Sequence, residues 1–142
     1  MTVRQQFNSK DFNYKTPISI RFADIDAFGH VNNAIYLTYF EMARSAYWNE
    51  IIEWDWNSVG IILRNSHVEY LKPIMLNDEV YAYVRTSRIG GSSFDLEYTL
   101  VKIINSEEQV CTTGSTLCIA YDYNVNKPVP IPEYQRRKME GQ

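Results

Sequence analysis

The feature that most constrains this chain is one long helical stretch, residues 34–48, that is apolar around most of its circumference. Two adjacent helical faces carry apolar or aromatic side chains: Ile35, Tyr39, Met42 and Ala46 on the first, and Tyr36, Phe40, Ala43 and Tyr47 on the second. A narrow polar stripe remains: Thr38, Glu41, Arg44 and Ser45. A helix with so wide an apolar surface must be covered by other structure. Because Glu41 and Arg44 are three residues apart on the stripe, we predict an ion pair between them.

The sequence after Gly60 changes to a period of two, which is typical of β-strands. It predicts four strands, over residues 61–70, 78–89, 92–104 and 109–121, separated by turn-forming residues. A shorter alternating run predicts a first strand over residues 18–22, and residues 133–140 are expected to form a short terminal helix. The short links between consecutive strands indicate an antiparallel meander.

This order of elements predicts an α+β fold in which an antiparallel five-stranded sheet wraps around one long central helix. The 142 residues are expected to form a single domain, residues 1–142, with a loose polar segment up to about residue 15. No stretch approaches the roughly 20 apolar residues of a membrane helix, and the polar start is unlike a signal peptide. We therefore expect a cytoplasmic protein without a membrane partner. The net charge of −3 and the absence of a Lys/Arg run argue against nucleic acid as a partner.

The two cysteines are expected to be small core residues without a role in redox chemistry or metal binding. Cys111 and Cys118 are seven positions apart in one predicted strand, so we expect them on opposite faces and about 23 Å apart. At that separation they cannot form a disulfide with each other. Since no C-x-x-C pair is present, the sequence indicates neither a redox motif nor a thiolate metal site.

Polar side chains gather in the loop between the first strand and the long helix: Asp24, Asp26, His30, Asn32 and Asn33. A helix N-terminus presents unpaired N–H groups and a positive dipole end, which suits reactions that develop negative charge on oxygen. Asp26 beside His30 therefore predicts a catalytic site, in which His30 either takes part in chemistry or orients the loop. Asp24 is interpreted as a turn or cap residue. Asn32 or Asn33 is the expected N-cap.

The run D-x-D-x-x-G-H-V-N-N-x-x-Y over residues 24–36, followed by E-x-A-R over residues 41–44, resembles the hotdog-fold acyl thioesterases. These include 4-hydroxybenzoyl-CoA thioesterase, the small bacterial acyl-CoA thioesterases and the plant acyl-ACP thioesterases. The resemblance extends to V-E-Y-L-K-P at residues 68–73 and P-I-P at residues 130–132. It implies a hotdog fold and hydrolysis of an acyl-CoA or acyl-ACP thioester, with no cofactor and no metal.

The resemblance also implies a role for individual residues of the loop. Asp26 matches the catalytic Asp of the bacterial 4-hydroxybenzoyl-CoA enzymes, as nucleophile or general base. His30 matches the His that the plant enzymes pair with this Asp, whereas Phe28 stands where those enzymes carry Asn. The backbone N–H of Asn33 corresponds to the group that polarises the thioester carbonyl. Tyr36, which closes the motif, is counted among the substrate-binding residues.

A second group of residues is expected to bind the carrier. The dipeptide Gly90-Gly91 is first of all a hairpin turn. The resemblance places this turn near the pantetheine arm of CoA, and the substrate-binding residues implied there are Gly90, Gly91, Ser92 and Ser93. Arg88, Arg85 and Lys72 are interpreted as contacts to the phosphates of CoA.

The predicted fold also favours self-association. One sheet around one helix leaves strand edges open, and its outer face is expected to carry Tyr81, Tyr83 and Tyr98. We therefore expect a homodimer or a homotetramer with the active site at the subunit junction.

Other classes of function remain open at this point. A hotdog acyl-CoA hydratase or dehydratase has four residues between its Asp and His, whereas three separate Asp26 from His30. A non-catalytic acyl-CoA-binding module would lack the reactive carboxylate. The D-x-D pair could hold Mg²⁺, but the sequence shows no P-loop or further acidic ligands.

Overall fold

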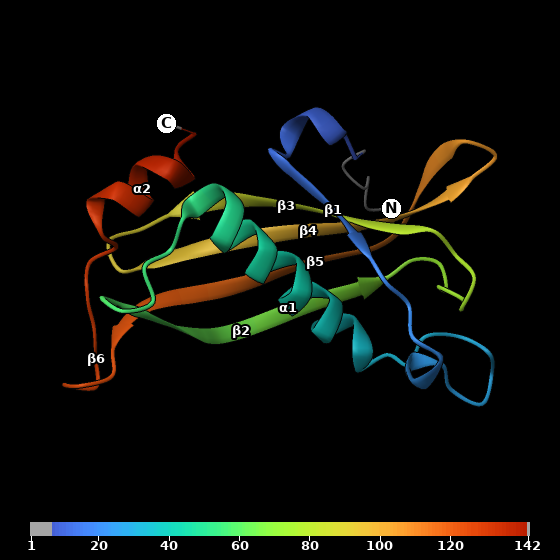
Figure 1. Ribbon diagram of the computed structural model, residues 1–142, viewed down its shortest axis with the longest axis horizontal. Coiled ribbons are helices and arrows are strands. Elements are labelled where there is room, and N and C mark those ends of the chain that lie inside the picture. Colours follow the sequence, from blue (N-terminus) through green and yellow to red (C-terminus); the bar gives the residue numbers. More distant parts are fainter. Residues whose placement is uncertain (1–6, 142) are drawn as a thin grey trace, which may run out of the picture.

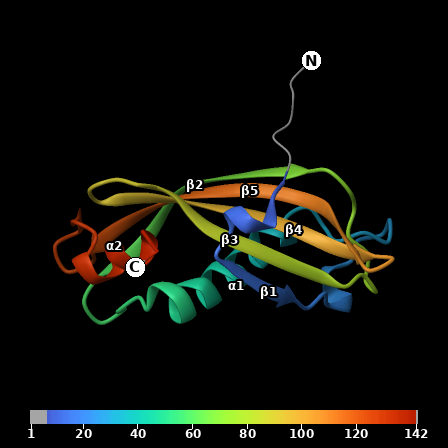
Figure 2. The same cartoon turned by 90° about the horizontal axis from the view of Figure 1, so that it is seen from above.

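One antiparallel sheet curves around one long helix in the computed structural model, which describes residues 7–141 (Figure 1; Figure 2). The strands are β1 (Tyr14–Ile18), β2 (Gly60–Tyr70), β3 (Val80–Ile89), β4 (Ser93–Ile104), β5 (Glu107–Asp122) and β6 (Lys127–Pro128). The helices are α1 (Ile35–Tyr47) and α2 (Glu133–Met139), with short helical turns η1 (Ser9–Asp11), η2 (Phe22–Asp24) and η3 (Trp48–Ile52). The predicted α+β arrangement is confirmed, with the two-residue β6 in addition to the five predicted strands.

The strand order is β1-β3-β4-β5-β2, with β6 paired to β5. The meander prediction is therefore right for β3, β4 and β5 but wrong for β2, which pairs with β5 and lies at the sheet edge. The reason lies in residues 71–79, which form a connection longer than a hairpin loop. This connection crosses to the start of α1, where the Ile74 carbonyl accepts a 2.8 Å hydrogen bond from the Val31 N–H.

The first strand begins earlier than predicted, because Tyr14–Ile18 pairs with β3 while residues 22–24 form the turn η2. The side chain of Phe22 is 82% exposed, so the alternation that suggested a strand to residue 22 does not reflect burial. Part of the segment expected to be loose is packed: the rings of Phe7 and Phe12 lie 5.2 and 5.9 Å from the ring of Tyr83. Residues 1–6 lie outside the described range.

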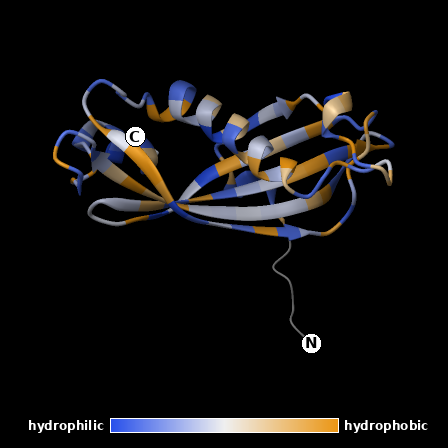
Figure 3. Cartoon of the chain, turned by 90° about the horizontal axis from the view of Figure 1, so that it is seen from below, coloured by the Kyte–Doolittle hydropathy of each residue, from blue (hydrophilic) through white to orange (hydrophobic). Residues whose placement is uncertain are grey.

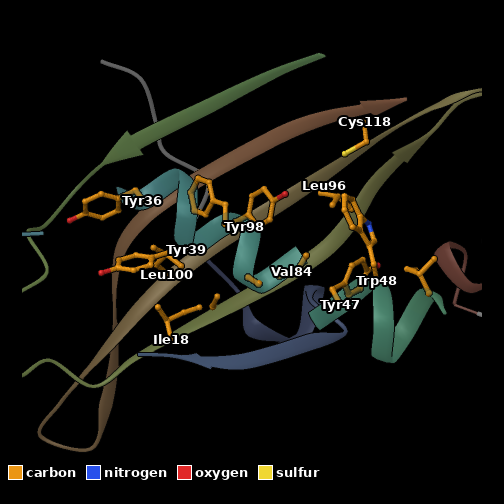
Figure 4. Close-up of a cluster of buried hydrophobic side chains, with 14 of the residues drawn as sticks. Ile18, Tyr36, Tyr39, Tyr47, Trp48, Val84, Leu96, Tyr98, Leu100 and Cys118 are labelled. Atoms are coloured by element: carbon orange, nitrogen blue, oxygen red, sulfur yellow. The ribbon is translucent and has the colours of Figure 1, made fainter. Parts of the chain in front are cut away.

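The core lies between α1 and the concave face of the sheet. Tyr39, Tyr47 and Trp48 of the helical segment lie among Val84 and Leu96 of the strands (Figure 4). Hydrophobic and hydrophilic residues alternate along the strands, as the period of two predicts (Figure 3). No helix within residues 7–141 is both long and apolar enough to cross a membrane.

The ring of Phe40 stacks on Tyr98, with 4.4 Å between the centroids and 9° between the planes. Tyr98 therefore faces the helix, and the expectation that it lies on the outer face is wrong. The predicted ion pair on the helix is also not formed. Glu41 is exposed, whereas Arg44 is 9% exposed and its guanidinium lies 5.8 Å from the ring of Trp48, one turn further on.

Both cysteines are fully buried, unpaired members of one core cluster. The expectation that they point to opposite faces is wrong. The pairing of β4 with β5 shifts between Leu100 and Val101, and Cys111 is the extra residue at this irregularity. A bulge residue interrupts the strict alternation of a strand, so positions 111 and 118 can face the same side despite their odd separation.

Gly114 of β5 generates a stability prediction, since a Cβ at this position would overlap with the ring of Phe40. Because the Phe40 ring is held by its stack on Tyr98, it cannot move aside freely. We expect Gly114→Ala to lower the free energy of unfolding by about 1–3 kcal/mol, measured by urea denaturation. The matched control is Gly91→Ala, where an added Cβ meets no atom within 4 Å. Equal midpoints for both variants would contradict the close packing of Phe40.

Candidate active site

The loop that leads into α1 is a tight, hydrogen-bonded structure. Ile25 and Val31 form an antiparallel bridge, and the Asp26 N–H donates to the His30 carbonyl at 2.8 Å. The Gly29 N–H donates to the Asp26 carbonyl at 3.1 Å, and Gly29 has a φ of 84°. A positive φ favours glycine, so the sequence G-H-V allows the chain to turn back towards the helix.

The carboxylate of Asp26 is held from one side only. Its Oδ1 accepts hydrogen bonds from the backbone N–H of Phe28, at 2.9 Å, and of His30, at 3.3 Å. Within residues 7–141 no group donates to Oδ2. The side chain is half-buried, so its orientation is fixed while one oxygen stays available for chemistry.

A pocket of about 220 Å³ opens beside this carboxylate. Its lining residues come from the loop, from the start of α1 and from the segment after β2: Asp26, His30, Val31, Asn33, Tyr36, Tyr70, Leu71, Lys72 and Pro73. The structure thus brings together four residues that the sequence predicted for the site, Asp26, His30, Asn33 and Tyr36. In the structure, His30 contacts the Asp26 carboxylate through a hydrogen bond donated by the His30 backbone N–H.

Sequence reasoning missed Tyr70 as a site residue. Its hydroxyl donates to the Asn33 carbonyl at 2.8 Å, and its ring meets the ring of Tyr36 edge-on at 4.9 Å. Tyr36 is buried, and burial is the main reason why the pKa of its hydroxyl is raised. Tyr70 is the last residue of β2 and belongs to the V-E-Y-L-K-P run that carries part of the family resemblance, but the spacing of that run gives no sign of the contact with Asn33.

The start of α1 offers backbone donors next to the carboxylate. The N-cap of α1 is Ala34, which makes no side-chain cap hydrogen bond, so the expectation that Asn32 or Asn33 is the N-cap is wrong. The Asn32 side chain accepts from the Ala34 N–H at 2.9 Å in the turn just before the helix. No described residue accepts from the N–H of Asn33, which lines the pocket. This free N–H, at the positive end of the helix dipole, can stabilise an oxyanion.

Asp24 serves the structure of the loop. It is 1% exposed and accepts hydrogen bonds from the Arg21 backbone N–H at 3.0 Å, the Arg21 guanidinium at 2.7 Å and the Tyr39 hydroxyl at 2.7 Å. Burial works to raise the pKa of Asp24, but the hydrogen bonds from Arg21 and Tyr39 outweigh it, and the pKa is lowered. The interpretation of Asp24 as a turn and cap residue is confirmed.

The predicted carrier-binding residues lie elsewhere in the chain. Gly90, Gly91 and Ser92 form the β3–β4 turn, at the opposite end of the sheet from the Asp26 loop (Figure 1; Figure 2). Arg88 pairs with Asp95 at 2.8 Å and also bonds to the Ser93 hydroxyl. One chain therefore does not bring its two predicted groups of site residues together.

The three basic residues interpreted as phosphate contacts differ in their pairing. Arg88 and Arg85 are both in ion pairs, Arg85 with Glu97 at 2.7 Å. Lys72 has no carboxylate partner in the described part of the chain and lines the Asp26 pocket. No three His, Cys, Asp or Glu side chains within residues 7–141 cluster as metal ligands would.

Comparison with known families decides the class of protein. The model of the thioesterase-like superfamily matches residues 20–139. The chain belongs to this superfamily. The Bacillus subtilis protein YsmA is 30% identical over 129 residues, which cover 90% of this chain and 86% of YsmA. The acyl-CoA thioester hydrolase YbgC of Escherichia coli O6:H1 is 26% identical over 128 residues, 84% of this chain and 90% of YbgC.

A solved structure of the superfamily confirms the hotdog fold. The thioesterase of Thermus thermophilus, in complex with coenzyme A and Zn, superposes with a TM-score of 0.78 at 33% identity. The match covers 92% of this chain and 93% of that chain. Membership of the thioesterase-like superfamily indicates thioester hydrolysis as the general activity.

The environment of Asp24 predicts a pH-dependent contribution to stability. A carboxyl whose folded pKa is lowered stabilises the fold above its unfolded pKa, about 3.9, and this contribution is lost as the pH falls through the folded value. We expect Asp24→Asn to reduce the free energy of unfolding by about 1.5–3 kcal/mol at neutral pH, because bonds to a charged group are lost. The difference from wild type, measured in melts at a series of pH values, should shrink below about pH 4. A difference that is the same at every pH would contradict the ionised state of Asp24.

Proposed function

We propose that this protein hydrolyses an acyl-CoA thioester to the free acid and CoA, with Asp26 as the catalytic carboxylate. The observation that carries the proposal is the geometry of Asp26. One of its oxygens is held by two backbone N–H groups, and Asp26 lines the same pocket as Asn33, whose N–H has no acceptor in the described part of the chain. The hydrolase YbgC and the CoA-bound Thermus thermophilus thioesterase support coenzyme A as the carrier. Acyl carrier protein is the other carrier that the sequence indicated.

In the proposed reaction the thioester carbonyl oxygen accepts a hydrogen bond from the Asn33 N–H. The helix dipole stabilises the negative charge that develops on this oxygen. Asp26 then acts in one of two ways. It attacks the carbonyl carbon, which releases the CoA thiolate and leaves a mixed anhydride for water to hydrolyse, or it takes a proton from a water that attacks instead.

The other residues of the pocket are assigned supporting roles. His30 orients the Asp26 carboxylate through its main-chain N–H. Tyr36 and Tyr70 form an aromatic wall beside the reacting carbonyl, and we propose that they contact the substrate. Lys72, the unpaired cation of the pocket in the described part of the chain, is the better candidate for a carrier phosphate than Arg88, whose charge is matched by Asp95.

We further propose that the protein works as a homodimer joined through β2. This strand is eleven residues long, lies at the sheet edge and is largely exposed. An edge strand of this length, without proline, is a template for pairing with another chain, whereas the opposite edge, β1, is short and contains Pro17. The edge of the sheet supports this proposal better than its outer face does, since Phe7 and Phe12 cover Tyr83.

The sheet register suggests why two chains are needed. The Tyr70 end of β2 lies at the Asp26 pocket, and its Gly60 end lies near the β3–β4 turn, because Gly60 pairs with Tyr121 and Ser93 with Ile119. Antiparallel pairing of two β2 strands about a two-fold axis places the Gly60 end of one strand beside the Tyr70 end of the other. The partner subunit's Gly91 turn would then lie at the end of the assembly that holds Asp26.

The first prediction from this proposal concerns Asp26. Either route needs the ionised carboxylate, so Asp26→Asn keeps the shape of the side chain and removes the chemistry. We expect kcat for acyl-CoA hydrolysis to fall at least about 10²-fold with a nearly unchanged melting temperature. Thiol release is the measurement, over short, long and aromatic acyl-CoAs and the corresponding acyl-ACPs. Near-full turnover by Asp26→Asn would overturn the site, and a hydrated acyl-CoA without free thiol would indicate a hydratase.

A single turnover in ¹⁸O-water, with enzyme in excess, tests for direct attack. Direct attack followed by hydrolysis at the enzyme carbonyl puts ¹⁸O into Asp26. General-base catalysis labels the released acid alone.

The second prediction tests the shared site by complementation. Gly91→Val should raise KM for acyl-CoA, because the added side chain would crowd the carrier arm. The fold should tolerate the change, since a Cβ at this position meets no atom of its own chain within 4 Å. Mixing Asp26→Asn subunits with Gly91→Val subunits gives heterodimers in which one site carries both defects and the other carries none. At low substrate concentration, we expect random mixing to restore about a quarter of wild-type activity.

The outcome against a shared site is equally clear. If Asp26 and Gly91 of the same chain build each site, every site in the mixture keeps one defect and no activity returns. A monomeric mass in solution with full activity would exclude the dimer itself.

A further inference from the structure

The carbonyl groups of the β3–β4 turn all accept hydrogen bonds from the protein. The Gly90 carbonyl accepts from Nη2 of Arg136 at 2.6 Å. The Gly91 carbonyl accepts from the Ile131 N–H at 3.0 Å and from the same Arg136 nitrogen at 3.1 Å. The Ser92 carbonyl accepts from the Ala120 N–H at 2.8 Å. One guanidinium, from α2, therefore fixes the orientation of two successive peptide groups.

The orientation of these peptide groups determines where their N–H groups point. In a planar trans peptide the N–H points away from the C=O. Because the carbonyls of Gly90 and Gly91 face Arg136, the N–H groups of Gly91 and Ser92 face away from it, and no described residue accepts from either. A cationic donor on the carbonyl also polarises the peptide, which strengthens the N–H as a donor.

The two glycines of the turn differ in what they require. A Cβ on Gly90 would lie 2.9 Å from Nη1 of Arg88, 3.0 Å from the Ser93 hydroxyl oxygen and 3.1 Å from the Ser93 carbonyl oxygen, so its own chain leaves little space there. A Cβ on Gly91 would meet nothing within 4 Å, and its φ is not in the left-handed region. Nothing in the described part of its own chain explains glycine at position 91, which is consistent with a ligand that approaches this backbone closely.

Arg136 is held in place by contacts at the far end of α1. In α2, the Tyr134 hydroxyl donates to the Glu53 carboxylate at 2.8 Å and Gln135 donates to the Glu53 carbonyl at 2.9 Å. Lys138 adds an ion pair to the same carboxylate at 3.2 Å. α2 is thus fixed to the residue that follows the helical segment, and Arg136 reaches from it to the turn.

We propose that Arg136 is a positioning residue for the carrier: it turns the N–H groups of Gly91 and Ser92 outward to bind an amide carbonyl of the pantetheine arm. This inference rests on the proposed acyl-CoA thioesterase function. Arg136 does not touch the thioester. Its effect passes through the two peptide groups whose carbonyls it holds.

The experiment compares two substrates that carry the same acyl group, one on CoA and one on N-acetylcysteamine, which lacks most of the pantetheine arm. Arg136→Ala should raise KM for the acyl-CoA about tenfold, the loss of one good hydrogen-bonding contact, and change kcat little. Its kcat/KM for the N-acetylcysteamine thioester should equal that of wild type. Arg136→Lys, which keeps a charged donor, should recover part of the KM. The control is Arg137→Ala on the same helix, whose partner is Glu133.

Four outcomes are informative. An equal loss on both substrates would show that Arg136 only supports the fold, and no loss on either would remove it from carrier binding. If Arg136→Ala does not fold in a urea titration, Arg136→Lys takes its place in the same comparison. If wild type cleaves neither thioester, the proposed function itself fails, which is distinct from a failure of this inference.

Discussion

The packing of α1 into the concave face of the sheet is the constraint on which the rest of the structure depends. Phe40 is stacked on Tyr98 and lies over Gly114, where an added Cβ would overlap its ring. These contacts set the distance of the helix from the sheet and its position along the strands. The position of the helix determines the position of its N-terminus. Asn33 and the Asp26 loop therefore lie beside the end of β2, where the Tyr70 hydroxyl donates to the Asn33 carbonyl.

Two carboxylates two residues apart have different tasks because their surroundings differ. Asp24 is enclosed by Arg21 and Tyr39, so its charge is neutralised and its oxygens are occupied. Asp26 is bonded only through backbone N–H groups to one oxygen, and the other oxygen is left free of protein donors in the described range. An ion pair at position 26 would have stabilised the loop and occupied the carboxylate that we propose as nucleophile or base. The loop instead obtains its rigidity from main-chain bonds and from Gly29.

Local patterns predicted most of the elements and the position of the candidate site. The apolar faces of residues 34–48 located the helix, and the period of two located β2 to β5 within about two residues. The predictions that were wrong concern strand pairing and side-chain direction, which depend on more than the local sequence pattern. The place of β2 beside β5 depends on where residues 71–79 cross, and the common face of Cys111 and Cys118 depends on one bulge. Tyr70 and Arg136 were missed because their roles come from hydrogen bonds to distant backbone carbonyls, which leave no periodic signal.

The attachment of α2 has a consequence for mixed assemblies. Within one chain, α2 contacts Glu53 through Gln135 and the β3–β4 turn through Arg136. In the proposed dimer, however, this turn lies beside the Asp26 of the other chain. The C-terminal helix of a subunit would then support its neighbour's active site and not its own. A mixed dimer of an intact copy and a copy truncated before α2 would then keep one working site, built from the Asp26 of the truncated copy and the turn of the intact one.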